Sequence, residues 1–297
     1  MAGLLNLQPK GARSMSGFLL AFGSRVGYTL PQGKEWSVKR NAVHELVGMM
    51  LIVCAAAYGA APSRPGVAAS VLTIANDGLT LGFDSQTGAL CTLFDRESGY
   101  EWLDDRLSTA SPWLIEYTSA SGRASLDIRF AESFSFTRPD PRTLVMEWRD
   151  FTAAENRTLR VRATVSLEEK RPLSSWRIAL LGAENKRIEQ VVFPRIARLK
   201  ESGEERLAVP QWMGQLMKNP RIELAKSKSE VKKFEWTYPG IFSLQCLALY
   251  HPQSCGLYAA CNDTSAFIKN FSIRLDTLHT LVYGLHHFPA YDSTLTD

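Results

Sequence analysis

The chain has 297 residues, of which 45% are hydrophobic and 22% charged, a composition typical of a globular protein long enough to bury a large core. Its formal net charge is +4, but residues 1–69 hold seven basic and two acidic residues, which leaves 27 basic and 28 acidic residues over 70–297. This larger part lacks the basic excess of proteins that bind phosphate backbones, so no nucleic-acid partner is expected.

Two segments precede the first clear β pattern. Residues 1–37 show no hydrophobic periodicity, and we expect them to be disordered or untranslated.

Residues 38–61 have the order of a secretory signal peptide, with Lys39 and Arg40 before an apolar run and small residues after it. The run is shorter than the roughly 20 residues of a membrane-spanning helix, so no stable span is expected after cleavage. We therefore predict a secreted or periplasmic protein; the alternative is a lipoprotein anchored through Cys54, although Val53 precedes it where a small residue is preferred.

The pattern from residue 71 to 290 is that of β-strands. A Pro- and Gly-containing linker over 62–70 leads into it. Apolar and polar residues alternate over 159–167, and a second alternating run follows over 173–180, so the two are predicted to pair antiparallel. Residues 79–83 and 89–94 flank a turn in which Gly88 can take a positive φ, which predicts a hairpin.

Short β-type runs continue to residue 288, and no stretch sustains a long 3.6-residue apolar rhythm. Many strands without interleaved helices favour an all-β fold. The span is about twice that of an immunoglobulin-type sandwich. We expect one large antiparallel two-sheet β-sandwich, with two small sandwiches as the alternative.

Three histidines, His279, His286 and His287, lie close together near the C-terminus. Adjacent residues on a strand point to opposite faces, so His286 and His287 do not easily serve one metal or proton-transfer site. We interpret all three as structural histidines at strand ends.

An acidic cluster is formed by Glu101, Asp104 and Asp105. Glycosidic hydrolysis needs two carboxylates at a fixed separation across the bond, which sequence neighbours do not establish. We interpret the cluster as a solvated loop, with a catalytic pair or a calcium site as alternatives. The sequence contains no nucleophile elbow, phosphate loop or His-Glu-x-x-His motif, so neither a catalytic residue nor a cofactor is assigned.

The cysteines do not form a zinc motif. Cys246, Cys255 and Cys261 lie near one another, but no Cys-x-x-Cys is present and no histidine stands at zinc-finger spacing, so no metal is expected. A chain reversal near 251–255 would place Cys246 opposite position 260 or 261. Free thiols are the expected state and a Cys246–Cys261 bridge is the alternative.

Three aromatic residues, Trp212, Trp236 and Tyr238, stand in turn-like surroundings. Aromatic rings in loops can stack on sugar rings while the indole N–H or phenol O–H binds a hydroxyl. They are the candidate carbohydrate-binding residues, and the alternative is that they close the ends of the sandwich core.

Strand and turn residues from 71 to 285 resemble the N-terminal β-sandwich of uncharacterised bacterial glycoside-hydrolase-like proteins, similar to endo-α-N-acetylgalactosaminidases. The residues that carry this resemblance are Gly82-Phe83-Asp84, Thr87-Gly88-Ala89-Leu90, Phe193-Pro194, Val209-Pro210, Gly214, Tyr238-Pro239-Gly240, Gln245, Leu249-Tyr250, Gly256 to Ala260 and Asp263. The resemblance implies a galactose-mutarotase-like supersandwich. The chain departs from the family at Cys246, where an aromatic residue is usual, and at Asn262, where a histidine is usual.

In that family a catalytic barrel follows the sandwich, and residues 291–297 would begin the linker to it. The resemblance therefore implies a non-catalytic part of a secreted glycoside-hydrolase-like protein that binds carbohydrate or packs against the barrel. One alternative is a freestanding sugar-active enzyme of the mutarotase type, and another is a secreted binding or structural protein.

Overall fold

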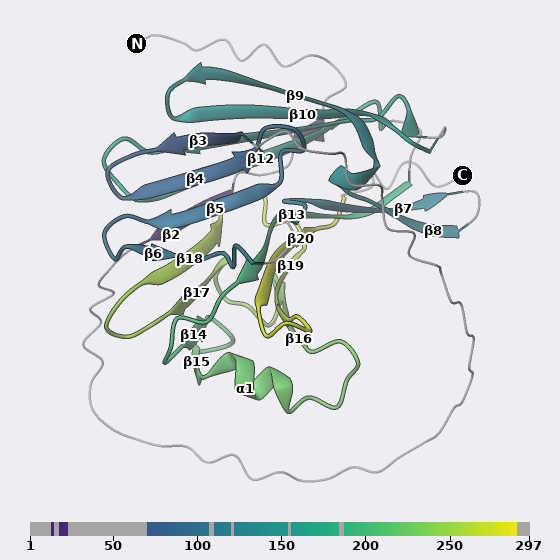
Figure 1. Cartoon of the computed structure of the whole chain (residues 1–297). Helices are drawn as coiled ribbons and strands as arrows, with labels where there is room; N and C mark the ends of the chain where they lie inside the picture. Colours follow the sequence, from purple (N-terminus) through teal and green to yellow (C-terminus); the bar gives the residue numbers. More distant parts are fainter. Residues whose placement is uncertain are drawn as a thin grey trace, which may run out of the picture. The chain divides into compact units, whose positions relative to one another are not determined.

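The computed structural model describes residues 70–106, 110–119, 122–153, 156–183 and 187–289, and two strands at 13–14 and 18–22. All their strand pairings are antiparallel, which confirms the predicted all-β class (Figure 1). The named helical elements of the described residues are the 3₁₀ turn η1 (Ile128–Phe130) and the helix α1 (Pro220–Ala225). No helix in these ranges has the length and apolarity to cross a membrane. The predicted signal peptide over 38–61, Cys54, most of the linker over 62–70 and residues 291–297 lie outside the described residues.

The largest sheet has ten strands. Across the sheet they are β15 (Gln215–Lys218), β14 (Arg206–Val209), β17 (Cys246–Tyr250), β18 (Gly256–Cys261), β2 (Phe18–Phe22), β12 (Leu173–Leu181), β11 (Arg160–Leu167), β10 (Thr143–Phe151) and β9 (Ala131–Asp140), with β1 (Arg13–Ser14) paired to β12. The predicted antiparallel pair is confirmed as β11 and β12, in which Val165 lies opposite Trp176.

Strand β2 differs from the expectation for the first 37 residues. Its backbone pairs with β12 on one side and with β18 on the other. The structure describes strands at 13–14 and 18–22, which differs from the expected disorder at these residues, and whether the segment is translated stays a prediction. An apolar run of five residues is too short to show periodicity, and only the two partner strands, more than 150 residues later in the chain, provide its hydrogen bonds.

Two smaller sheets complete the fold. The six-stranded sheet has the order β16 (Lys233–Tyr238), β19 (Lys269–Leu275), β20 (Leu281–His287), β13 (Arg187–Leu199), β7 (Leu114–Ser119) and β8 (Gly122–Leu126). The four-stranded sheet has the order β3 (Val71–Ala75), β4 (Leu79–Asp84), β5 (Leu90–Asp95) and β6 (Tyr100–Glu101). The third sheet is an addition to the predicted pair of sheets.

The core lies where the sheets meet. Trp176 on β12 is fully buried, with its ring 5.7 Å from that of Phe83 on β4 and 6.0 Å from that of Phe193 on β13. One indole of the large sheet thus contacts both smaller sheets. Trp113 and Trp148 make a second such contact at 5.5 Å, edge to face.

The predicted hairpin is confirmed between β4 and β5. Asp84 Oδ1 accepts hydrogen bonds from the backbone N–H of Gln86 and Thr87, and Gly88 has φ of 70°. A Cβ at Gly88 would stand 2.5 Å from Phe134 and Trp148, so only glycine fits this turn.

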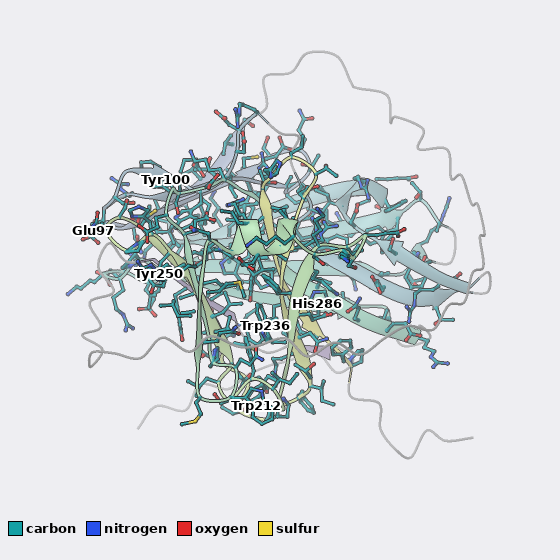
Figure 2. The ribbon with its side chains drawn as sticks, turned by 90° about the horizontal axis from the view of Figure 1, so that it is seen from below. Glu97, Tyr100, Trp212, Trp236, Tyr250 and His286 are labelled. Atoms are coloured by element: carbon teal, nitrogen blue, oxygen red, sulfur yellow. The ribbon has the colours of Figure 1, made fainter. Side chains whose placement is uncertain are left out.

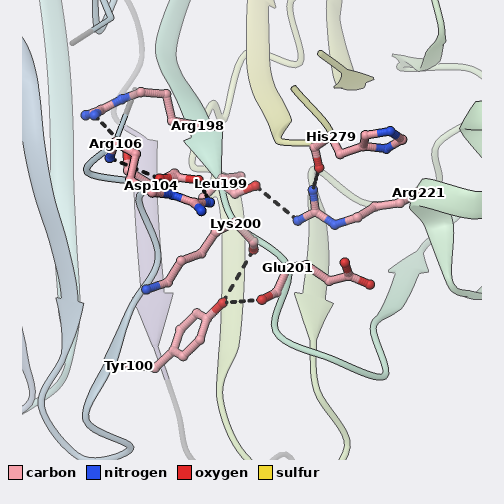
Figure 3. Close-up of polar contacts among 9 residues, drawn as sticks. All are labelled: Tyr100, Asp104, Arg106, Arg198, Leu199, Lys200, Glu201, Arg221 and His279. Carbon is pink, nitrogen blue, oxygen red and sulfur yellow. Dashed lines mark hydrogen bonds and ion pairs between the residues drawn. The ribbon is translucent and has the colours of Figure 1, made fainter. Parts of the chain in front are cut away.

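Two buried arginines hold the end of β13 (Figure 3). Arg198 donates to the carbonyl oxygens of Asp104 at 2.9 Å and Leu90 at 2.7 Å. Arg221 binds the Glu205 carboxylate with two nitrogens, at 2.7 and 2.9 Å, and donates to the His279 carbonyl at 2.5 Å. These contacts join segments far apart in the sequence, so the two side chains have a structural role.

Candidate functional site

One face of the six-stranded sheet carries polar side chains, and we call it the outer face. Cross-strand partners point to the same side of a sheet, and the register places Asn270 opposite His286, and Ser272 opposite both Glu235 and Gly284. The alternate residues of the same strands form the core face, with Trp236, Phe271, Tyr283 and Leu285 buried. The outer face therefore collects polar groups from β16, β19 and β20.

His286 is held by hydrogen bonds on both ring nitrogens. Its Nε2 lies 2.8 Å from Ser272 Oγ, and its Nδ1 lies 3.0 Å from Gln190 Oε1. With Nδ1–H donating to the Gln190 oxygen, Nε2 is left as an acceptor toward the serine side. Burial lowers the pKa of His286 below its ordinary value, although the negative charge of Glu235 opposes this. The imidazole is therefore neutral at pH 7.

Gly284 provides the space in which these groups meet. A Cβ at this position would stand 3.0 Å from Val192 Cγ1, 3.1 Å from Ser272 Oγ and 3.2 Å from His286 Nε2. Its φ is not positive, so the requirement is for space and not for a special backbone conformation. The missing side chain lets the histidine and the serine approach each other.

Glu235 adds a carboxylate beside the histidine. Burial alone would raise its pKa, but hydrogen bonding to Lys233, 2.6 Å away, and the charge of that lysine lower the pKa below its ordinary value. Asn270 Nδ2 donates to the same carboxylate at 3.3 Å. An ionised carboxylate and an amide beside a neutral imidazole and a hydroxyl are groups of the kinds that bind sugar hydroxyls. Both ring nitrogens of His286 already have protein partners, so a ligand would bind the imidazole by replacing one of them.

The three aromatic residues predicted to bind carbohydrate do not form one platform. Trp236 is 5% exposed and stacks on Phe242 with ring centroids 5.4 Å apart, so its ring faces are not available to a sugar. Tyr238 is half-buried, and the Lys269 ammonium lies 5.1 Å from its ring centroid. Both project to the core face because they alternate with Glu235 along β16.

Trp212 differs from the other two. It is 74% exposed in the turn between β14 and β15, with φ of 54°. Figure 2 shows it well away from His286. Only this member of the predicted set keeps an accessible ring, and it lies outside the polar outer face.

The other two histidines and the acidic cluster lie outside the outer face. His287 projects to the core face and lies 3.0 Å from the Phe193 carbonyl oxygen, and His279 is exposed in a turn. Glu101 accepts hydrogen bonds from the backbone of Leu93 and Leu103, and Asp104 is 6% exposed and paired with Arg106. Glu101 and Asp104 are therefore bound into the fold, in contrast to the expected solvated loop, whereas Asp105 is exposed as expected.

Sequence reasoning missed His286 as a site residue because its partners lie on other strands. The sequence did carry a signal: polar or small residues at 233, 235, 270, 272, 284 and 286 are separated by single residues that include the core positions 234, 271 and 285.

Within the described ranges, no group of three or more His, Cys, Asp or Glu residues could hold a metal ion. Cys246 pairs with Ala260, so Cys246 and Cys261 point to opposite faces, and they form no disulfide.

Comparison with known proteins gives similarity of fold alone. No family model and no curated protein matches the chain. A galactose mutarotase-like protein from Lactobacillus casei ATCC 334 is similar over 77% of this chain and 90% of its own, with 10% identity and a TM-score of 0.42. A galactose mutarotase related enzyme from Lactobacillus acidophilus is similar over 75% of this chain and 99% of its own, with 11% identity and a TM-score of 0.39. Neither is described as an endo-α-N-acetylgalactosaminidase, so that link remains a prediction.

Proposed function

We propose that this protein binds carbohydrate on the outer face of the six-stranded sheet, around His286. The observation that carries the proposal is the fixed chain Ser272–His286–Gln190 beside the ionised Glu235. Sugar recognition needs several hydrogen-bonding groups of both kinds converging on one surface. The outer face brings them together from three strands.

A titration of a sugar panel tests this proposal. We expect binding of at least one hexose, and a loss of about tenfold or more in affinity for His286→Ala, since a removed hydrogen-bonding partner leaves polar groups unpaired. Trp212→Ala is the matched control, because it removes an aromatic ring outside this face. Binding that survives His286→Ala and is lost in Trp212→Ala would place the sugar at Trp212 instead.

A mutarotase-type activity is the second candidate. It needs a general acid and a general base facing one sugar ring. His286 and Glu235 are residue types that serve these roles, but both are in the base form here, so one of them would have to take up a proton before it acts as the acid. Polarimetry of freshly dissolved glucose or galactose tests it. Accelerated anomer exchange that is lost in both His286→Ala and Glu235→Gln would support the enzyme, whereas binding without acceleration would support a binding protein.

The expected non-catalytic role beside a glycoside-hydrolase barrel is also a proposal. It is supported by an exposed apolar surface on three loops, which we call the apolar tip: Trp212, Met213, Ile241, Leu244, Phe267 and Ile268. Two of these loops are joined by a hydrogen bond from Trp212 N to Ile241 O at 3.0 Å. Exposed apolar patches commonly mark protein interfaces. Light scattering should show self-association that Met213→Ser reduces; a monomer at high concentration would contradict an interface here.

A further inference from the structure

The outer face carries a group of cations next to the proposed sugar site. Arg195 lies opposite Gly284 on one side of β20, and Arg274 lies opposite Val282 on the other. Lys233 is in turn the cross-strand partner of Arg274. Lys233 and Arg274 are like charges directly opposite each other, which repel; Glu235 compensates Lys233, and Arg274 has no such anion among the described ion pairs.

Two of the nearby carboxylates are paired with other cations, and a third, Asp276, whose charge also acts on Arg195, accepts hydrogen bonds from Thr277. Glu235 is paired with Lys233 at 2.6 Å, and Asp127 is paired with Arg129 at 2.7 Å. In the part of the chain that the structure describes, neither Arg195 nor Arg274 forms an ion pair. The Arg195 guanidinium makes one hydrogen bond, from Nη1 to the Ser111 carbonyl at 3.1 Å, which leaves most of its donors free.

The two arginines affect each other. Both are half-buried. Burial, and then the positive charge of Arg274, lower the pKa of Arg195 below its ordinary value. Desolvated guanidinium groups that lack a carboxylate are suited to a carboxylate or phosphate, which they bind through paired charge-assisted hydrogen bonds.

Arg195 and Arg274 lie next to residues of the proposed sugar site. Along β20, His286 and Gly284 are neighbours on the outer face, and Arg195 lies across from Gly284. Along β19, Ser272 and Arg274 are likewise neighbours. Residues two positions apart along a strand share a face and are about 7 Å apart, which is close to the width of a hexose ring plus its exocyclic substituent.

We propose that Arg195 and Arg274 form an anion subsite, and that the ligand of the outer face is an acidic sugar whose carboxylate or phosphate they bind. This inference rests on the proposed sugar site and specifies its ligand class. The hydroxyl groups would lie toward His286 and Glu235, and the anionic group toward the two arginines.

The test compares glucose, glucuronate, glucose 6-phosphate and inorganic phosphate as ligands of the full chain. We expect one acidic sugar to bind about tenfold or more tightly than glucose, and added salt to reduce this preference. Glucuronate carries a carboxylate and glucose 6-phosphate carries a phosphate, so comparing their affinities shows which of the two anionic groups the subsite binds. Arg274→Gln should remove the preference without changing glucose affinity, and Arg274→Lys should retain part of it.

Arg177→Gln is the matched control, since Arg177 is an exposed arginine on β12 of the ten-stranded sheet. It should leave every affinity unchanged, and circular dichroism should show the same fold for all variants. Equal affinity for glucose and both acidic sugars would overturn the anion subsite and leave the sugar site standing. Inorganic phosphate bound as tightly as glucose 6-phosphate would overturn an acidic sugar as the ligand. The proposed function itself would be overturned if no sugar binds the wild-type protein, or if sugar binding is unchanged in His286→Ala.

Discussion

His286 Nε2 and Ser272 Oγ lie 2.8 Å apart on neighbouring strands, directly over the missing side chain of Gly284. The contact couples a half-buried, neutral imidazole to the hydroxyl of a serine that is 5% exposed. It depends on a glycine whose backbone is ordinary, so it can be disturbed by a single methyl group.

Gly284→Ala should displace His286 from Ser272, because the new Cβ would stand 3.0–3.2 Å from Val192, Ser272 and His286. We expect a destabilisation of about 1–3 kcal/mol from overpacking and a His286 pKa closer to its ordinary value. NMR titration of the imidazole measures the second effect. Gly122→Ala, at a position with nothing within 4 Å, strains the turn between β7 and β8 and should leave the His286 titration unchanged. An identical titration in both variants would contradict the proposed packing.

His287 should make the fold sensitive to acid. Burial lowers its pKa from 6.5 to about 4, against the opposing effect of its hydrogen bond to the Phe193 carbonyl. The neutral form is therefore favoured in the folded state, and the unfolded chain binds a proton first as the pH falls below 6.5. This contribution to stability is complete above pH 6.5 and declines by about 3 kcal/mol toward pH 4. Urea unfolding of the wild type and His287→Gln across pH 4–7 measures it, and parallel curves would rule it out.

The Arg221–Glu205 pair is buried, with the two side chains 7% and 2% exposed. Glu205→Gln leaves the guanidinium without its counter-charge and should cost about 3–5 kcal/mol of unfolding free energy. Glu204→Gln is the matched control, because that neighbouring glutamate is exposed and pairs with Arg206 on the surface. Its cost should stay below about 1 kcal/mol. Denaturant midpoints of the two variants that coincide would show that the buried pair does not anchor the end of β13.

Strand β2 can be tested by truncation. Without residues 1–37, β12 and β18 lose their common neighbour and both present unpaired edges. We expect a chain that begins at residue 38 to lose more than about 2 kcal/mol of stability and to self-associate more readily than the full chain, since each lost backbone hydrogen bond contributes about 1 kcal/mol. Thermal unfolding and light scattering of the two chains measure this. Equal stability would instead agree with translation from position 38.

The state of the cysteines has a direct readout. Cys91, Cys246, Cys255 and Cys261 form no disulfide in the structure, and burial raises the pKa of three of these thiols, Cys91, Cys246 and Cys255. In the folded protein they should react slowly, because the thiolate is the reactive form. In denaturant without reductant, all four should be labelled. A pair that resists labelling until reduction would show a disulfide.

The sequence alone determined the strands and their immediate pairings. Alternation over 159–167 and 173–180 predicted β11 and β12, and Gly88 predicted the β4–β5 hairpin, because a half-buried strand and a tight turn impose their patterns on adjacent residues. The pattern also implied that His286 and His287 would face opposite sides, and their hydrogen-bond partners agree.

Only the tertiary structure decided which residues form a site. Gln190, Ser272 and His286 lie on three strands, and their register depends on bulges in β13 that no local pattern specifies. Trp236 and Trp212 looked equivalent as aromatic residues in turn-like segments, yet one is buried and the other is exposed. Strand alternation determines which residues share a face, but whether a face becomes core or surface depends on which sheet packs against it, and contacts distant in sequence make that choice.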